Sequence, residues 1–139
     1  MRARLPRLLE WLDEFKPDVA LLQEIKATEE TFPRLEIEDR GYNVEIYGQK
    51  NFNGVALLSN SPIKDVIRGL PNNAEDHQAR YIEGLTAGIR VASIYLPNGN
   101  PVPGDKFDYK LRWMECLCEH MQDCLTPDKA IVFGGDYNI

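Results

Sequence analysis

Acidic residues follow two short apolar runs of this sequence, at positions where they could take part in chemistry. Glu24 comes directly after residues 19–23, and Asp136 follows residues 130–133 across two glycines, with Asn138 two positions further on. A locally extended backbone would direct the side chains of Asp136 and Asn138 to the same side. Carboxylate and amide oxygens are hard ligands that suit Mg²⁺ or Mn²⁺ and suit Zn²⁺ poorly. The pattern is compatible with a metal site, and equally with acidic residues that cap turns at strand ends.

The two acidic residues can share a site only if the fold brings the ends of their runs together. If residues 19–23 and 130–133 form parallel neighbouring strands, Glu24 and Asp136 meet at one edge of the sheet, where α/β proteins build their sites. The glycines before Asp136 would let backbone and ligand approach closely. Tyr95, which ends another apolar stretch and precedes the sequence LPNG, is either a core aromatic residue or a phenol presented to a ligand.

Hydrophobic periodicity predicts the elements that would position these residues. Helical spacing predicts a helix over residues 5–15, a shorter one between 28 and 40, and a long one over residues 107–125. Strands are predicted at residues 19–23, 42–47, 55–59, 64–68, 81–86, 89–96 and 130–133, with a tight turn at Ala87-Gly88. The first of these strands does not alternate between apolar and polar residues, which is typical of a strand covered on both faces. This order of elements indicates one α/β domain with a mixed sheet.

The long C-terminal helix carries the three cysteines of the sequence, Cys116, Cys118 and Cys124. An odd number of cysteines so close together is not a disulfide framework, which favours the reducing cytoplasm. Cys116, His120 and Cys124 would share one stripe of the helix, but a rise of about 1.5 Å per residue separates the outer two by ~12 Å, too far to share one ion. We therefore expect half-buried thiols there and a core face made of the regularly spaced apolar residues Phe107, Leu111, Met114, Leu117, Met121 and Leu125.

The composition is that of an acidic globular chain. Its 139 residues suffice for one domain, and 16 Lys and Arg against 22 Asp and Glu give a net charge of −6. This balance argues against a histone-like protein that binds nucleic acid by charge alone, so any affinity for phosphate must come from individual placed residues or from a metal ion. The longest apolar runs are four residues, far short of the ~20 that cross a bilayer.

Four segments of the sequence, in this order, resemble the exodeoxyribonuclease III family: LLQEIK at 21–26, GQKNFNGVALLS at 48–59, IYLPNGN at 94–100 and GGDYNI at 134–139. The opening RARLPRLLEWL is similar to the first helix of that family, so the resemblance covers essentially the whole chain. QE and GDxN alone would indicate only the wider endonuclease/exonuclease/phosphatase superfamily. Lys26 and the Tyr95-x-Pro-Asn string point to the branch of exonuclease III and apurinic-site endonucleases, and away from phosphodiesterases that act on phospholipids or inositol phosphates.

The resemblance implies a Mg²⁺-dependent (or Mn²⁺-dependent) DNA-repair nuclease, acting as a 3′–5′ exodeoxyribonuclease and abasic-site endonuclease. In that family's pattern Glu24 would ligate the divalent ion and Tyr95 would contact the scissile phosphate. Asp136 would orient or deprotonate the attacking water, and Asn138 would hold water and phosphate in line. These roles suit phosphodiester hydrolysis, which needs a cation, a positioned nucleophile and hydrogen-bond donors on the phosphate oxygens.

The partner that the resemblance implies is double-stranded DNA with abasic sites or 3′ ends, with no membrane involved. Lys26, Lys50 and Asn51 are weaker candidates for contacts with the DNA backbone, because solvated loop side chains would have the same sequence pattern.

The resemblance also implies that part of the fold is absent. Family members begin with a further strand before the first helix and continue into a second half that supplies another aspartate and an Asp-His pair. We therefore expect residues 1–139 to be one incomplete domain, about half of a four-layer α/β/β/α sandwich, with little or no nuclease activity by itself. An uncovered sheet face would favour self-association, for instance as a homodimer. Two alternatives stay open: a non-catalytic remnant or self-association module, and a superfamily phosphodiesterase acting on another phosphate ester.

Overall fold

The computed structural model of the chain describes residues 1–138. In chain order its elements are the 3₁₀ helix η1 (Arg2–Arg4), α1 (Leu5–Phe15), β1 (Val19–Gln23), α2 (Arg34–Glu38), β2 (Asn43–Tyr47), β3 (Val55–Ser59), β4 (Ile63–Arg68), β5 (Tyr81–Thr86), β6 (Ile89–Tyr95), α3 (Asp105–Cys124) and β7 (Ile131–Asp136). The helices and strands expected from periodicity all form; four of them have the predicted bounds, and the ends of the other strands and of the long helix differ by at most three residues.

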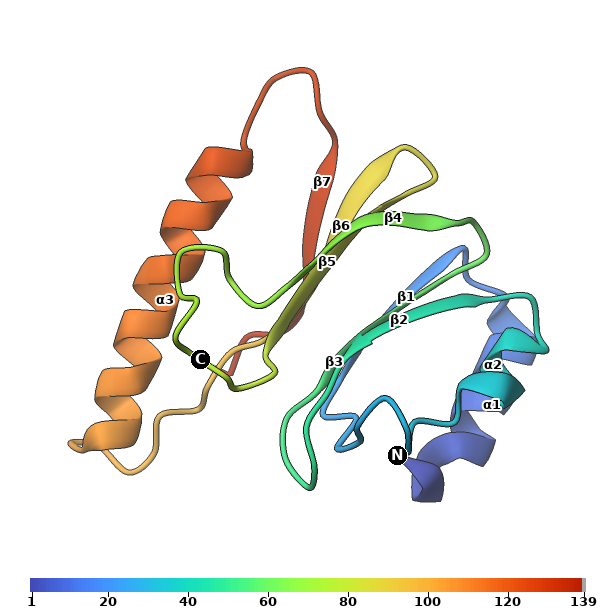
Figure 1. Ribbon diagram of the computed structural model, residues 1–139, viewed down its shortest axis with the longest axis horizontal. Coiled ribbons are helices and arrows are strands. Elements are labelled where there is room, and N and C mark those ends of the chain that lie inside the picture. Colours follow the sequence, from blue (N-terminus) through green and yellow to red (C-terminus); the bar gives the residue numbers. More distant parts are fainter. Residues whose placement is uncertain (139) are drawn as a thin grey trace.

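The strands form two sheets that pack face to face between two layers of helices (Figure 1). The first sheet has the order β1-β3-β2 and is antiparallel throughout. The second has the order β4-β5-β6-β7 and is mixed, because β6 and β7 run parallel while the other pairs are antiparallel. Helices α1 and α2 cover the outer face of the first sheet, and α3 covers the outer face of the second. The α/β class, the mixed sheet and the α/β/β/α layering are therefore confirmed.

Strand β3 shows why a continuous apolar run forms here. It is the middle strand of the first sheet and is buried along its whole length. Because side chains alternate along a strand, Val55 and Leu57 point into the space between the sheets, while Ala56 and Leu58 face α1 and α2. Both faces of the strand are thus apolar surfaces covered by another layer.

The space between the sheets is filled by the chain itself. Val55 and Leu57 of the first sheet pack against Ile82 and Val91 of the second, and all four are at most 6% exposed. The expected uncovered sheet face, and with it the reason for expecting a homodimer through that face, was wrong. The physical cause is that this chain contributes strands to both sheets, so each inner face covers the other.

Strands β1 and β7 are not the parallel neighbours considered above. Strand β1 pairs antiparallel with β3 at the edge of the first sheet, whereas β7 pairs with β6 at the edge of the second. Strand β1 was expected to be covered on both faces. Because it lies at the edge of its sheet, four of its five residues are only half-buried. The two strands nevertheless approach each other across the sandwich, because a Cβ at Gly134 of β7 would lie only 2.8 Å from Cδ1 of Leu21 in β1.

Helix α3 packs on the sheet with only part of the expected apolar face: Leu117 is buried and Met114 and Met121 pack against the core. Its buried residues are Trp113, Leu117 and His120, while Leu111 and Leu125 of the predicted apolar face are 44% and 68% exposed. The apolar spacing thus predicted the middle of the buried face and missed its other members, Trp113 and the polar residue His120. Within residues 1–138, no helix combines the length and the apolarity needed to cross a membrane.

Candidate active site

Glu24 and Tyr95 are in direct contact although they lie 71 positions apart in the chain. Glu24 directly follows β1 and Tyr95 ends β6, so the contact joins the carboxyl ends of strands from two different sheets. The Tyr95 hydroxyl donates a hydrogen bond to Oε1 of Glu24. Burial, followed by this hydrogen bond and the charge of Glu24, raises the pKa of Tyr95 to about 12. The phenol is therefore protonated at neutral pH and can act as a donor.

Two hydrogen bonds fix the end of β1 against β6. The side-chain amide of Gln23 donates to Oγ of Ser93 at 2.9 Å, and the Ser93 hydroxyl donates to the carbonyl oxygen of Leu22 at 2.8 Å. Ser93 is fully buried, so its hydroxyl would be costly to leave without partners. These bonds lie one and two residues before Glu24 and determine where its carboxylate meets Tyr95.

Asp136 and Asn138 lie on the other side of Tyr95, at the end of β7. The parallel register places Asp136 beside Tyr95, and the backbone N–H of Leu96 donates to the carbonyl oxygen of Asp136 at 2.9 Å. Oδ1 of Asp136 accepts the backbone N–H of Asn138 at 3.1 Å, and the Asn138 amide donates to the carbonyl oxygen of Leu96 at 2.9 Å. The charge of Asp136 adds to the causes that raise the pKa of Tyr95, after burial and the effect of Glu24.

The two glycines before Asp136 allow β7 to pack closely against neighbouring strands. Gly135 has a φ of 147°, and a Cβ there would lie 2.1 Å from the carbonyl oxygen of Ile94. Gly134 in turn makes room for Leu21 of β1. The expectation that these glycines admit a ligand is replaced by a structural role: they let β7 lie close to both β6 and β1.

Lys110 ties α3 to the loops on which the candidate residues lie. Its ammonium group donates to the carbonyl oxygen of Asn138 at 2.8 Å and to that of Asn98 at 3.4 Å. The Lys110 stem also packs against Gly99, where a Cβ would lie 2.8 Å from Cδ of the lysine. Sequence reasoning missed this residue, because nothing in the pattern of α3 distinguishes one lysine as a bridge.

The backbone is left-handed at several non-glycine residues around this point. Glu24 has a φ of 52°, Asn138 a φ of 36° and Asn53 a φ of 54°. The loop at Asn53 lies beside the segment that follows Glu24, because the carbonyl oxygen of Asn53 accepts the N–H of Lys26 at 2.9 Å. Backbone in this region is disfavoured for residues with a Cβ and tends to occur at functional sites. The conformation of these loops is thus one that the rest of the fold must hold in place.

Two open hollows flank the contact between Glu24 and Tyr95. Tyr95 lines one of about 480 Å³, together with aromatic, amide and basic side chains that include Phe52, Asn53, Gln78, Arg80, Lys106 and Tyr109. Glu24 lines the other, of about 660 Å³, with residues of α1 and its neighbours that include Arg4, Arg7, Trp11, Gln23 and Lys26. A ligand that touches both Glu24 and Tyr95 would lie between these hollows.

Arg80 places a positive charge in the Tyr95 hollow. Its guanidinium carbon lies 5.0 Å from the centroid of the Tyr95 ring and 5.8 Å from that of Tyr109. Nη1 also donates to the carbonyl oxygen of Tyr95 at 3.2 Å, and Nε donates to Oε1 of Gln78 at 2.9 Å. Sequence reasoning missed Arg80 because it stands at a strand start with no recognisable spacing to Tyr95.

The structure separates the three expected DNA-contact residues. Lys26 is exposed and lines the same hollow as Glu24. Lys50 and Asn51 are exposed in the turn between β2 and β3 and line neither of the two hollows. Their neighbours Phe52 and Asn53 do line the Tyr95 hollow. Lys26 is thus brought to the candidate site, and Lys50 and Asn51 are not.

The donor set at this point fits a hard divalent cation. Glu24 and Asp136 offer carboxylate oxygens and Asn138 an amide oxygen, all of which suit Mg²⁺ or Mn²⁺. Both carboxylates belong to exposed residues, so a cation can reach them from solvent. No sulfur or imidazole ligand comes from these residues, which disfavours Zn²⁺.

Comparison with known proteins finds a matching family and related sequences. A family model described as "Endonuclease/Exonuclease/phosphatase family" matches residues 2–139. The exodeoxyribonuclease III of Haemophilus influenzae is 35% identical over 144 residues, which cover 100% of this chain and 54% of that protein. An exodeoxyribonuclease of Bacillus subtilis is 26% identical over 133 residues, covering 94% of this chain and 51% of that protein. The chain thus spans about half the length of the relatives it matches.

Solved structures of similar proteins show the same fold. A 3′–5′ exonuclease from Neisseria meningitidis superimposes with a TM-score of 0.95 at 37% identity, covering 99% of this chain and 54% of that one. An AP endonuclease from Archaeoglobus fulgidus gives a TM-score of 0.94 at 36% identity, covering 99% of this chain and 53% of that one. A 3′ phosphatase from Neisseria bound to a product DNA hairpin gives a TM-score of 0.95 at 36% identity, covering 99% and 53%.

Proposed function

The chain belongs to the endonuclease/exonuclease/phosphatase family, and on this basis we propose that it carries one part of the active site of a metal-dependent DNA-repair nuclease. The reaction we propose is hydrolysis of phosphodiester bonds in double-stranded DNA, at 3′ ends and at abasic sites. The observation that carries the proposal is the contact between Glu24 and Tyr95, which puts an anionic ligand and a protonated phenol side by side. Residues 1–139 would form part of a single domain, and the three free thiols favour a reducing cytoplasm.

In this proposal Glu24 binds the catalytic ion, which would be Mg²⁺ or Mn²⁺. Nucleases of this family are metal-dependent, and an exposed carboxylate beside a phosphate-binding donor suits such an ion. When bound, the ion supplies positive charge that stabilises the charge developing on the phosphate. The hydrogen bond from Tyr95 would orient the Glu24 carboxylate toward the ion, as outer partners of metal ligands do.

Tyr95, Asp136 and Asn138 would act on the phosphate and the attacking water. The Tyr95 phenol stays protonated at neutral pH. When a phosphate binds, Tyr95 would turn its single O–H from Glu24 to a nonbridging phosphate oxygen. The Asp136 carboxylate would accept a hydrogen bond from water and take its proton as the water attacks. Asn138 would hold water and phosphate in line through its amide, and Lys110 would fix the backbone of Asn138.

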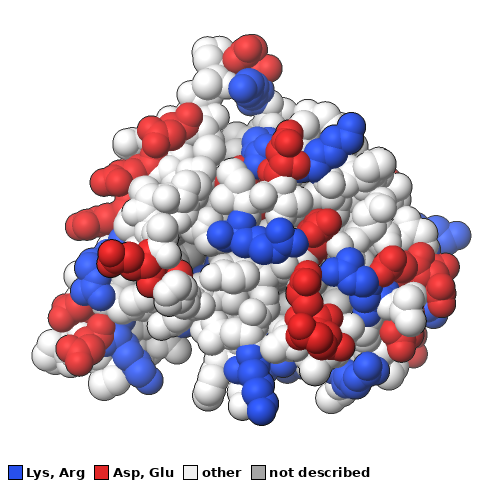
Figure 2. All heavy atoms as spheres, viewed as in Figure 1, with Lys and Arg blue, Asp and Glu red and all other residues white. Residues whose placement is uncertain are grey.

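The DNA would approach the hollows beside Glu24 and Tyr95 rather than the outer face of α3. On the face shown in Figure 2, positive and negative side chains are interspersed, and acidic side chains gather along the edge formed by α3. Exposed acidic residues of that helix are Asp105, Asp108, Glu115, Glu119 and Asp123. Arg80 and Lys106 supply positive charge in the Tyr95 hollow, and Arg4, Arg7 and Lys26 supply it in the Glu24 hollow. Lys50 and Asn51 stay weaker candidates for the DNA backbone.

The proposal is tested by binding measurements that do not require turnover. Electron paramagnetic resonance would follow Mn²⁺ binding to the chain, and fluorescence anisotropy would follow binding of a labelled duplex with one abasic site. We expect Mn²⁺ to strengthen duplex binding and Glu24→Ala to remove this effect, because the carboxylate ligand is lost. Glu10→Ala, an exposed acid on α1, is the control and should behave like the parent. Unchanged Mn²⁺ and DNA binding in Glu24→Ala would refute the proposal.

A further inference from the structure

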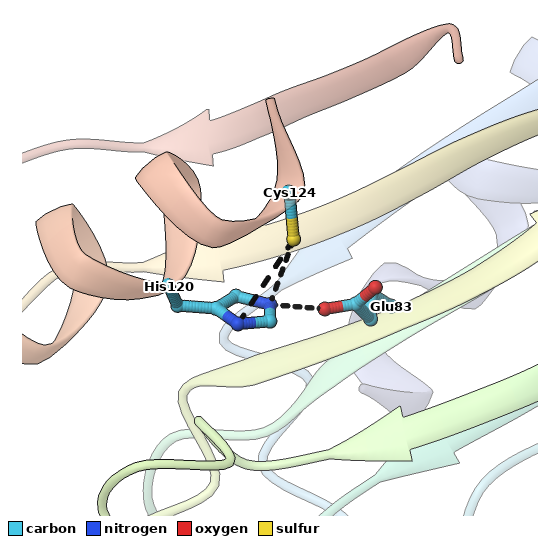
Figure 3. Close-up of side chains that lie close together, drawn as sticks. All are labelled: Glu83, His120 and Cys124. Carbon is cyan, nitrogen blue, oxygen red and sulfur yellow. Dashed lines mark hydrogen bonds and ion pairs between the residues drawn. The ribbon is translucent and has the colours of Figure 1, made fainter. Parts of the chain in front are cut away.

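Glu83, His120 and Cys124 form a compact cluster between β5 and the last two turns of α3. Figure 3 shows the three side chains converging, with Glu83 reaching up from its strand toward the helix. One donor atom from each residue lies within 4.8 Å of the others. Lys110 near the start of α3 contacts the candidate active site, and His120 and Cys124 lie ~15–20 Å further along the helix axis. The cluster is therefore a separate feature of the molecule.

Both partners of His120 approach the same ring nitrogen. Oε1 of Glu83 lies 2.5 Å from Nε2, and Sγ of Cys124 lies 3.5 Å from that nitrogen. A neutral imidazole nitrogen carries either one proton or one lone pair, so it cannot hydrogen-bond well to a carboxylate and a thiol together. A cation placed among the three atoms would satisfy all of them at once.

The distance between Cys124 and His120 matches that of two ligands of a tetrahedral ion. Zn–N bonds of about 2.05 Å and Zn–S bonds of about 2.3 Å at a tetrahedral angle place nitrogen and sulfur about 3.6 Å apart. Sγ of Cys124 and Nε2 of His120 are already 3.5 Å apart. Because Sγ also lies 4.0 Å from Nδ1, beside the ring, the Cys124 and His120 side chains would have to rotate so that the Nε2 lone pair and the sulfur meet one ion. The carboxylate would have to move back from 2.5 Å to about 3.4 Å from Nε2, a small shift of one side chain. Two ligands four residues apart on one helix also face the same side.

We propose that Glu83, His120 and Cys124 bind one Zn²⁺ ion that fastens the end of α3 to β5. Thiolate and imidazole ligands select Zn²⁺ over Mg²⁺, so this ion differs in kind from the one proposed at Glu24. Three protein ligands leave a fourth position for water. Binding replaces the thiol proton of Cys124, which goes to solvent. The neutral imidazole of His120 keeps its one proton on Nδ1, so that Nε2 offers its lone pair to the ion, and no oxidation state changes.

Neighbouring side chains fix the position of the Glu83 carboxylate, as is usual for a side chain that binds a metal ion. Tyr81 donates to its Oε1 at 2.7 Å and Arg90 donates to its Oε2 at 2.6 Å. The Tyr81 ring also meets the His120 ring edge-on, with centroids 5.5 Å apart. Outer contacts of this kind fix the orientation of metal ligands.

The ligand set can be tested with Co²⁺ as a spectroscopic stand-in for Zn²⁺. We expect about one equivalent of Co²⁺ to produce the near-ultraviolet thiolate-to-cobalt charge-transfer band, and Zn²⁺ to abolish it by displacement. The band should be lost in Cys124→Ser and kept in Cys118→Ser, a matched change at an exposed cysteine of the same helix. Glu83→Gln should weaken binding by more than tenfold, and Tyr81→Phe by about tenfold. Circular dichroism would verify that each variant is folded.

A second readout is thermal stability. Zn²⁺ should raise the melting temperature of the chain and of Cys118→Ser, and leave that of Cys124→Ser unchanged, because only a bound ion stabilises the folded state. Absence of the band in the parent chain, or its persistence in Cys124→Ser, would overturn the site. Neither readout involves DNA or the ion at Glu24, so this inference stands or falls independently of the proposed nuclease function.

Discussion

The hydroxyl of Tyr95 donates to the carboxylate of Glu24 across the interface between the two sheets. Neither strand pairs with the other, since β1 lies in the first sheet and β6 in the second. The candidate active site is therefore a product of sheet packing rather than of one sheet edge. A change that shifts the sheets relative to each other should alter the site without touching its residues.

Replacing Tyr95 with Phe should slow phosphodiester hydrolysis by the protein that contains this chain. Losing one donor to a developing oxyanion costs about 10²–10³ in kcat, and we expect KM to change much less. Steady-state kinetics on an abasic-site duplex measures both. Tyr42→Phe, a buried tyrosine that packs in the core beside α1 and α2 and donates to the carbonyl oxygen of Pro17, should retain the parent's rate. A kcat for Tyr95→Phe within about threefold of the parent would remove Tyr95 from the mechanism.

The 139-residue chain by itself should incise an abasic-site duplex only weakly in the presence of Mg²⁺. It spans about half the length of its relatives, and among the described residues Glu24 does not belong to a group of three His, Cys, Asp or Glu donors close enough to hold an ion. A gel assay with end-labelled duplex measures the rate. Turnover close to that of a full-length relative, lost in Glu24→Ala, would show that this expectation is wrong.

Replacing Gly135 with Ala should destabilise the chain strongly. Its new Cβ would lie 2.1 Å from the carbonyl oxygen of Ile94, at a φ of 147°. We expect a loss of about 3 kcal/mol in the free energy of unfolding, from overpacking and backbone strain together. Gly88→Ala is the control, because that glycine also has positive φ but no atom within 4 Å of the added Cβ. Gly88→Ala should cost about 1 kcal/mol in the free energy of unfolding. Equal losses for the two variants in urea unfolding would contradict the close approach of β7 to β6.

The link between β1 and β6 through Ser93 should also contribute to stability. Ser93→Ala leaves the Gln23 amide and the Leu22 carbonyl without their partner, which should cost about 1–3 kcal/mol. Ser61→Ala is a suitable comparison, since Ser61 bonds only through its backbone and should lose a few tenths of a kcal/mol. Chemical unfolding of both variants distinguishes them, and the prediction fails if the two losses are the same.

Alkaline pH should destabilise the fold, because burial raises the pKa of every one of the six tyrosines. An unfolded tyrosine ionises near pH ~10 while the folded one keeps its proton, so stability present below that pH is lost as pH rises. Tyr109 contributes to this loss through burial and its hydrogen bond to Asp76. Tyr109→Phe should therefore lose less stability than the parent between pH ~9 and ~11. Urea unfolding midpoints of both proteins, measured across that pH range, test this prediction. An equal fall of the two midpoints with pH would contradict it.

The sequence predicted the elements well because their signals are local. Runs such as residues 55–59 and the turn at Ala87-Gly88 depend on neighbours in the chain, and the left-handed φ values of 51° and 78° in that turn are those a tight hairpin requires. The pairing of β1 with β3, rather than beside β7, depends on contacts between distant residues that a single sequence does not encode in its periodicity.

The candidate site was predictable where residue type, strand ends and a family motif agreed. Spacing marked Glu24 and Asp136 as candidates and left Tyr95 open, and the resemblance gave a role to Glu24 and to Tyr95, which the structure places in contact. Arg80, Lys110 and the Gln23–Ser93 bond have no sequence signature, because each acts through a partner on another element. His120 was overlooked as a core residue because hydropathy treats histidine as polar, although here it is 9% exposed and bonded to Glu83.

Each sheet, with its covering helices, is built from one continuous stretch of chain. Residues 5–59 supply α1, α2 and the first sheet, residues 63–136 supply the second sheet and α3, and a short loop joins them. Contacts within each stretch can thus form early in folding, whereas the hydrogen bond between Tyr95 and Glu24 must await their docking. A polypeptide nicked between β3 and β4 would consist of two complementary fragments, and recovery of that hydrogen bond would report their reassembly.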